Sequence, residues 1–207
     1  SHELKTPLTS LGGFLQLAQR KTSDPQVAKF LHKAGEQVSK LNRLVSDLLD
    51  VTRVEHARLP FHKETFDCRN LILEVVDTFQ QTYPAWNIHY SGTEHPAPVY
   101  ADKQRIEQVL INLIDNAIKY SPQSKKVFVG MQVAGDSIRI SVRDEGIGMT
   151  EEQQKGLFKR FYRVEDNLTK IPGLGLGLYL SEQIISAHGG ELACKSEEGK
   201  GSELYFL

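Results

Sequence analysis

The chain has 207 residues, of which 40% are hydrophobic and 25% are charged, a composition typical of a globular protein. Its formal net charge of -1 gives no overall attraction to nucleic acid or to an anionic membrane. No apolar run approaches the roughly 20 residues that a bilayer-spanning helix needs, and no signal peptide opens the chain. The chain starts without Met and already resembles the inside of a helix, so we expect a fragment of a longer protein. Its two cysteines, Cys68 and Cys194, are far apart and indicate a reducing compartment, so we expect the fragment to be cytoplasmic, with neither nucleic acid nor membrane as a partner.

Apolar residues recur in alternating steps of four and three, a heptad pattern that predicts a first helix ending near Lys21. Ser23 or Asp24 can cap a second helix, with Pro25 at its first position. The stripe positions are Leu4, Leu8, Leu11, Leu15, Ala18, Val27, Leu31, Ala34, Val38, Leu41, Val45, Leu48 and Thr52. Two such helices predict an antiparallel hairpin. The hairpin either packs on the rest of the chain or, as we expect, pairs with a second copy into a four-helix bundle.

After the hairpin, short alternating segments and helical segments are mixed, which predicts an α+β two-layer sandwich. The expected domains are the hairpin at 1–57, a linker at 58–62 and the sandwich at 63–207. The expected strands are 61–66, 88–90, 99–100, 127–133, 137–142, 191–195 and 202–206. The expected helices are 69–83, a long one that Asp102 caps and that ends at 120, and 176–187.

The long helix carries polar side chains on one face that suit a metal–phosphate ligand. Asn112 and Asn116 are four residues apart, and Lys119 lies one turn beyond Asn116. Amide oxygens are ligands for a hard cation, and a lysine attracts phosphate. Taken alone, the same spacing also fits an ordinary solvated helix face.

Three further segments have the chemistry of a nucleotide site. Residues 144–149 (DEGIGM) follow a strand, and their glycines permit a tight turn and close approach to a flat ligand. Residues 173–178 (GLGLGL) open a helix, where backbone amides can bind an anion. This segment is neither a P-loop nor a dinucleotide motif. Residues 158–163 (FKRFYR) interleave aromatic rings with cations.

Together these segments resemble the catalytic core of the sensor histidine kinases. Residues 112–120 match the family's N box, 144–148 the G1 box, 158–161 the F box and 173–177 the G2 box. The resemblance covers nearly the whole chain. It implies a Bergerat-type ATP-binding sandwich that uses ATP and Mg²⁺.

The resemblance also implies residue roles. Asp144 binds the adenine amino group, Asn116 holds Mg²⁺ with support from Asn112, and Lys119 and Tyr120 contact phosphate and nucleotide. Other residues implied to line the nucleotide are Gly146, Gly148, Gly173, Leu174, Gly175 and Gly177.

A lid over the phosphates is expected at about residues 150–172. Within it, Arg160 is a candidate contact for the γ-phosphate. Leu174 stands where many members carry a small hydroxyl residue, so one hydrogen bond of the lid is expected to be missing.

Residues 2–7 (HELKTP) resemble the family's H box. This implies that His2 accepts the γ-phosphoryl group of ATP. Glu3 can accept a proton from one ring nitrogen and leave the other as nucleophile. Thr6 is implied to act in dephosphorylating the partner, a response regulator receiver domain whose aspartate takes the phosphoryl group. The resemblance further implies a homodimer through 1–57, and a parent protein attached to the inner membrane.

Two other functions remain open at this stage. ATP hydrolases of the same superfamily place a glutamate where Asn112 stands, because they must activate water. A catalytically degenerate dimeric scaffold is the second alternative, although the four nucleotide boxes and the acceptor motif are all present.

Overall fold

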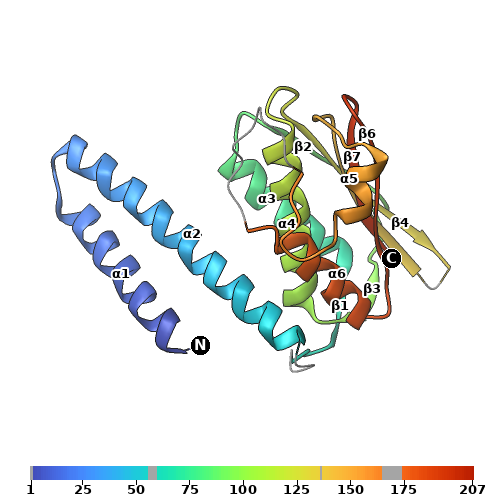
Figure 1. Cartoon of the computed structure of the whole chain (residues 1–207), viewed down its shortest axis with the longest axis horizontal. Helices are drawn as coiled ribbons and strands as arrows, with labels where there is room; N and C mark the ends of the chain where they lie inside the picture. Colours follow the sequence, from blue (N-terminus) through green and yellow to red (C-terminus); the bar gives the residue numbers. More distant parts are fainter. Residues whose placement is uncertain (1, 56–59, 136, 165–173) are drawn as a thin grey trace. The chain divides into compact units, whose positions relative to one another are not determined.

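The structure consists of two compact units, residues 1–59 and residues 60–207, each of which is described by itself (Figure 1). This computed structural model describes residues 2–55, 60–135, 137–164 and 174–207. The first unit is a hairpin of two helices, α1 (His2–Lys21) and α2 (Pro25–Glu55). None of the described helices combines the length and the apolar character needed to cross a bilayer.

The start of α2 is fixed by a side-chain cap. Asp24 Oδ1 accepts hydrogen bonds from the backbone N–H groups of Gln26, at 2.7 Å, and of Val27, at 3.3 Å. Pro25 occupies the first helical position, where its missing N–H costs nothing. The predicted hairpin, its break and its cap are therefore confirmed, and Asp24 is the capping residue.

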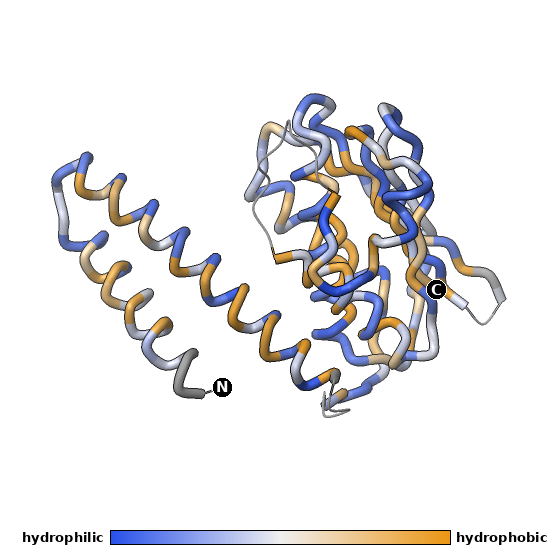
Figure 2. The backbone as a smooth tube through the Cα atoms, viewed as in Figure 1, coloured by the Kyte–Doolittle hydropathy of each residue, from blue (hydrophilic) through white to orange (hydrophobic). Residues whose placement is uncertain are grey.

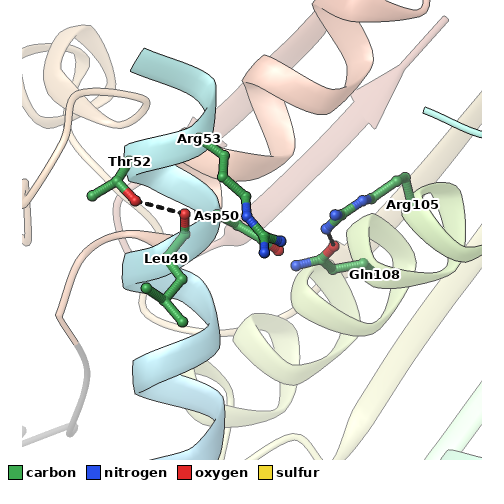
Figure 3. Close-up of polar contacts among 6 residues, drawn as sticks. All are labelled: Leu49, Asp50, Thr52, Arg53, Arg105 and Gln108. Carbon is green, nitrogen blue, oxygen red and sulfur yellow. Dashed lines mark hydrogen bonds and ion pairs between the residues drawn. The ribbon is translucent and has the colours of Figure 1, made fainter. Parts of the chain in front are cut away.

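Polar contacts between neighbouring turns continue to the carboxyl end of α2 (Figure 3). Thr52 Oγ1 donates to the carbonyl of Leu49 at 2.8 Å, and Arg53 pairs with Asp50 at 3.5 Å. Such pairs within one helix contribute only a few tenths of a kcal/mol, roughly 0.2–0.5 each. They do not by themselves hold the hairpin together.

The hairpin leaves much of its apolar surface uncovered. Figure 2 shows apolar positions recurring along both helices. Val38 is buried and lies beside Gly12, where an added Cβ would be 3.8 Å from Val38 Cγ1. Large apolar side chains remain exposed at Leu11, Phe14, Leu17, Val27, Phe30, Leu41 and Leu48. This exposed surface is what a hairpin built to pair with another helical surface retains.

The second unit is an α+β sandwich of two layers, as predicted (Figure 1). A mixed sheet in the order β2-β4-β5-β7-β6 forms one layer, with β2 parallel to β4 and the other pairs antiparallel. Helices α3, α4 and α6 pack on it, and β1 and β3 form a separate antiparallel pair. The elements are β1 (Glu64–Asp67), α3 (Cys68–Thr82), β2 (Asn87–Ser91), β3 (Pro98–Ala101), α4 (Lys103–Tyr120), β4 (Lys126–Ala134), β5 (Ser137–Asp144), α5 (Glu151–Gly156), α6 (Gly177–Ala187), β6 (Leu192–Glu197) and β7 (Gly201–Phe206).

The core of this unit lies between α4 and the sheet. Along α4 the predicted apolar side is fully buried, at Ile106, Val109, Leu110, Leu113 and Ala117. The sheet contributes buried side chains at Val127, Val129, Met131, Ile140 and Val142. The neighbouring helices contribute Leu71, Ile72, Ile184 and Ile185. The α4 helix thus packs against α3, α6 and the sheet.

One prediction was wrong in detail, and one short helix was missed. The strand expected at 61–66 begins only at Glu64, because Phe61 instead packs edge-on against the His188 ring, with centroids 5.1 Å apart. The short helix α5 (Glu151–Gly156) was not predicted, because its sequence is polar and shows no apolar period. A capping box between Thr150 and Gln153 starts it.

Asp102 joins three parts of the second unit. Its carboxylate accepts hydrogen bonds from the N–H of Arg105, at 3.1 Å, and of His62, at 2.8 Å. Its own N–H donates to His188 Nε2 at 3.0 Å. Burial alone would raise the pKa of Asp102, but the two backbone hydrogen bonds, together with Arg105 and His188, hold it below its usual 3.8. Asp102 therefore caps α4 as predicted, and it also anchors the segment that leads into β1.

We predict that Asp102→Ala lowers the free energy of unfolding by about 2 kcal/mol at neutral pH, since it removes a helix cap and leaves a second N–H unpaired. Because the folded-state pKa is depressed, this contribution is present above pH 3.8 and is lost as the pH falls through the folded-state value. Urea unfolding across this pH range measures it. The matched control is Glu94→Ala, an exposed carboxylate. If the difference in unfolding free energy between wild type and Asp102→Ala stayed constant as the pH fell, this account would be contradicted.

Candidate functional site

The central feature of the site is the polar face of α4. The helix turns by about 100° per residue, so Asn112, Asn116 and Lys119 lie within about 60° of one another, along one edge of the buried apolar side. The two asparagines and the lysine are half-buried. At the opposite end of α4, Arg105 Nη1 donates to Gln108 Oε1 at 2.8 Å (Figure 3).

The charge of Lys119 is already paired within its own helix. Its Nζ lies 2.6 Å from Oδ2 of Asp115, whose side chain is largely buried. Asp115 thereby holds the ammonium group of Lys119 against the surface of α4. A phosphate that binds Lys119 would compete with Asp115 for the ammonium group, or would share that group with it.

The G1 segment closes against the carboxyl end of α4. Asp144 ends β5, and its Oδ1 accepts the N–H of Gly146 at 2.8 Å. The next amide, Ile147 N–H, donates to the carbonyl of Tyr120 at 3.2 Å. A Cβ at Gly146 would overlap that carbonyl, and Gly148 has a φ of 65° and lies against the Glu197 carbonyl. The glycines are therefore required for the loop to approach α4 and the β6–β7 hairpin.

The G2 segment meets α4 from the other side. Gly177 begins α6, and a Cβ there would overlap Oδ1 of Asn112. The amide nitrogen of Asn112, Nδ2, donates to Ser181 Oγ at 2.9 Å. Gly175 has a φ of 68°, and Leu174 is exposed. Gly173 lies outside the described residues.

The F box and the G2 segment are joined by a backbone hydrogen bond. Phe161 N–H donates to the Gly175 carbonyl at 3.0 Å, and Phe161 itself has a φ of 61°, unusual for a residue with a bulky side chain. The Arg160 guanidinium lies over the Phe161 ring at 4.7 Å, and the Tyr162 ring packs against Gly156. Within the part of the expected lid that the structure describes, up to residue 164, Arg160 is exposed.

The candidate acceptor motif lies in the other unit. His2 and Glu3 begin α1, and their side chains lie outside the described part of the structure. Thr6 lies one turn further along α1 and is exposed.

Burial shifts the acidity of two site residues. Asp144 is 6% exposed, and this burial raises the pKa of its carboxyl group, although Gly146, Ser202 and Arg143 act in the opposite direction. The pKa of Tyr120 is also raised by burial, with Arg163 opposing the change. A buried carboxylate that ends a strand is poised to accept a hydrogen bond from a ligand.

Contacts thus link the four predicted segments in one continuous series: G1 to the end of α4, α4 to the start of α6, and the G2 segment to the F box. Sequence reasoning did not identify Asp115 and Ser181 as members of this group. The available signals were their spacings, because Asp115 lies four residues before Lys119 and Ser181 lies four after Gly177.

Comparisons with known proteins agree with this geometry. Residues 101–207 match the "Histidine kinase-, DNA gyrase B-, and HSP90-like ATPase" family, and residues 1–57 match the "His Kinase A (phospho-acceptor) domain". The chain belongs to these two families, and the pair makes it a sensor histidine kinase catalytic core. The resemblance seen in the sequence is confirmed.

Individual relatives support the same assignment. The chain is 34% identical over 213 residues to the sensor histidine kinase WalK of Bacillus subtilis, covering 100% of this chain but only 35% of WalK. The structure of the Acinetobacter baumannii histidine kinase AdeS superposes with a TM-score of 0.68 at 32% identity, covering 100% of this chain and 97% of AdeS. The histidine kinase ThkA, solved in complex with the response regulator protein TrrA, gives a TM-score of 0.67 at 25% identity over 99% of this chain and 58% of ThkA.

We predict that Asp144→Asn raises the stability of the ligand-free protein at pH 7. Because the folded-state pKa of Asp144 lies above its usual 3.8, the charged form is disfavoured in the folded protein. Stability therefore falls as the pH rises from 3.8 through the folded-state pKa. The variant should therefore lose its advantage below pH 3.8. Thermal unfolding at several pH values measures this. Glu145→Gln is the control, because it removes the neighbouring exposed carboxylate, and it should not reproduce the gain.

Proposed function

We propose that this chain binds ATP in its second unit and transfers the γ-phosphoryl group to His2 in its first. The observation that carries the proposal is the series of contacts that gathers the N, G1, F and G2 segments around α4. The acceptor motif of residues 2–7 stands in the same chain, within the part that matches the phospho-acceptor family. The hairpin at 1–57 then displays the acceptor, 58–62 is the linker, and 63–207 binds the nucleotide.

In this proposal the G1 segment recognises the base. Asp144 accepts a hydrogen bond from the adenine amino group, which compensates the cost of burying its carboxylate. Gly146 and Gly148 let the loop backbone approach the ring, and Tyr120 contacts the nucleotide from the end of α4. Support comes from the short approach between this loop and the Tyr120 carbonyl.

The G2 segment and Lys119 would then hold the phosphates. The start of α6 presents backbone N–H groups and the positive end of the helix dipole. Gly173, Leu174, Gly175 and Gly177 line this side, with Arg160 reaching the γ-phosphate from the F box. Arg160 is exposed, and its guanidinium lies over the Phe161 ring of the same segment.

The donor set fits a magnesium ion. Asn112 and Asn116 place amide oxygens four residues apart on one helix face, which is suitable for a hard cation that keeps waters and binds phosphate oxygens. Asn116 would be the ligand and Asn112 its support. When bound, Mg²⁺ neutralises phosphate charge in the transferring group.

The residues of α1 would accept the phosphoryl group. An imidazole nitrogen of His2 attacks the γ-phosphorus in line with the leaving oxygen, while Glu3 takes the proton from the other ring nitrogen. Lys119 and Arg160 compensate the charge of the leaving diphosphate and of the transferring group. Thr6, on the same helix, would position water when the partner is dephosphorylated.

The proposed partners are a second copy of the chain and a receiver domain. The exposed apolar side chains of the hairpin support pairing into a four-helix bundle. The ThkA structure contains a response regulator bound to a related kinase, which supports an aspartate-bearing receiver domain as the phosphoryl acceptor. The chain spans about a third of WalK and 47% of the kinase ArlS of Staphylococcus aureus. We propose that this part is the cytoplasmic core of a longer parent, which the family resemblance implies is attached to the inner membrane.

Simple ATP hydrolysis is disfavoured by the chemistry of residue 112. A carboxamide cannot take a proton from water at neutral pH, and Nδ2 of Asn112 is engaged by Ser181. The site can bind and orient ATP but lacks, at this position, the base that a hydrolase needs.

The test is incubation with ATP labelled at the γ-phosphate. Wild type should acquire label that is labile in acid and stable in base, as expected of phosphohistidine, and His2→Gln should acquire none. His32→Gln, which changes an exposed histidine of α2, is the matched control and should label normally. Label that survives in His2→Gln, or phosphate release without labelling, would overturn the proposal.

We predict that Asn116→Ala reduces autophosphorylation by at least about 100-fold, because it removes the proposed metal ligand from the phosphate-binding face. The fold should persist, since Asn116 is not part of the core. Gln108→Ala, two turns earlier on the same helix, is the control. Label incorporation over a range of Mg²⁺ concentrations is the measurement, and wild-type Mg²⁺ dependence in Asn116→Ala would refute the metal role.

A further inference from the structure

The carboxamide of Asn112 is held on both sides by the first turn of α6. Its oxygen, Oδ1, occupies the space that a Cβ of Gly177 would fill, and its nitrogen, Nδ2, donates to Ser181 Oγ at 2.9 Å. Gly177 and Ser181 are four residues apart and therefore lie on the same face of α6. One turn of helix thus contacts both ends of one amide.

Ser181 has the properties of a residue that sets orientation. It is 2% exposed and lies in the same helix as the buried Leu180, Ile184 and Ile185. A carboxamide has an acceptor end and a donor end that differ little in shape, so packing alone cannot distinguish them. In the structure the Ser181 hydroxyl accepts a hydrogen bond from Nδ2, which anchors that end of the carboxamide on α6. In that orientation Oδ1 lies beside Gly177, where the G2 segment enters α6.

We infer that Ser181 is a positioning residue for nucleotide binding: it directs the oxygen of Asn112 toward the phosphate side of the site, where metal and phosphate are bound. This inference rests on the proposed function. It also gives Gly177 a second role, because the absence of a side chain there lets the carboxamide fit between α4 and α6. Ser181 acts through Asn112 and touches neither substrate nor metal.

A purely structural role for Ser181 makes a different prediction. If the hydroxyl only satisfies a buried amide, its loss weakens the packing of α4 against α6 and affects every form of the nucleotide equally. If it orients the Asn112 oxygen, its loss affects chiefly the metal-bound form. The dependence of affinity on Mg²⁺ therefore separates the two roles.

The probe is AMPPNP, a non-hydrolysable ATP analogue, titrated by calorimetry with Mg²⁺ and with EDTA. Ser181→Ala should bind Mg²⁺–AMPPNP roughly three- to tenfold more weakly, the effect of one hydrogen bond, with unchanged affinity in EDTA. Ser181→Thr, which keeps the hydroxyl, should restore the Mg²⁺-dependent affinity. The control is Ser196→Ala, because that half-buried hydroxyl donates to the Gly201 carbonyl in the β6–β7 hairpin, and it should change neither affinity.

A double-mutant cycle with Asn112→Ala completes the test, and thermal unfolding verifies that each variant is folded. In the Asn112→Ala background, Ser181→Ala should cause no further loss, since the residue through which it acts is gone. The positioning role would be overturned if Ser181→Ala lost equal affinity for AMPPNP with and without Mg²⁺, or if the losses of affinity from the two substitutions were additive. If wild type binds Mg²⁺–AMPPNP and Ser181→Ala binds it with the same affinity, this inference alone is overturned. If folded wild type does not bind AMPPNP, the proposed function is overturned as well.

Discussion

The packing of α4 against the sheet is the interaction on which the site depends. Val109, Leu110 and Leu113 are completely buried, and together they fix the rotation of the helix about its axis. The polar face is then fixed too, because each residue follows the last by about 100°. A shift by one residue would bury the carboxamide of Asn112 or Asn116 without partners, at a cost of about 1–3 kcal/mol each.

The glycine-rich segments are built around this fixed helix. At Gly146 the loop backbone reaches the Tyr120 carbonyl, and at Gly177 the helix start reaches the Asn112 side chain, each through space that a Cβ would occupy. Glycine is usually read in such motifs as a means to expose amides to phosphate. Here it has a second effect, because it brings two segments into direct contact with α4.

Asp144 carries an electrostatic cost that the proposed hydrogen bond from adenine would offset, because burial raises the pKa of this carboxyl group and so disfavours its charged form. A buried charge of this kind reduces the stability of the protein and increases the benefit of binding a hydrogen-bond donor. The hairpin carries a cost of another kind, its exposed apolar side chains, which the proposed second copy would cover.

Much of this protein is determined by local sequence. The heptad stripes, the Asp24 cap, the Asp102 cap and the apolar side of α4 each depend on contacts between near neighbours in the chain, and each was predicted. The family also followed from the sequence, because the order of its motifs is itself a property of the sequence. The polar helix α5 was missed because a capping box, and no apolar period, starts it.

Tertiary structure decided the rest. The burial that raises the pKa of Asp144 comes from the folded unit as a whole. Asn112 contacts Gly177 and Ser181, which are far from it in the chain. Ser181 lies 69 positions after Asn112, and nothing near either residue in sequence indicates the other. Such contacts depend on how α4 and α6 pack side by side on the sheet, and packing of that kind is set by the whole core, whereas caps and periodic patterns are set within a few residues.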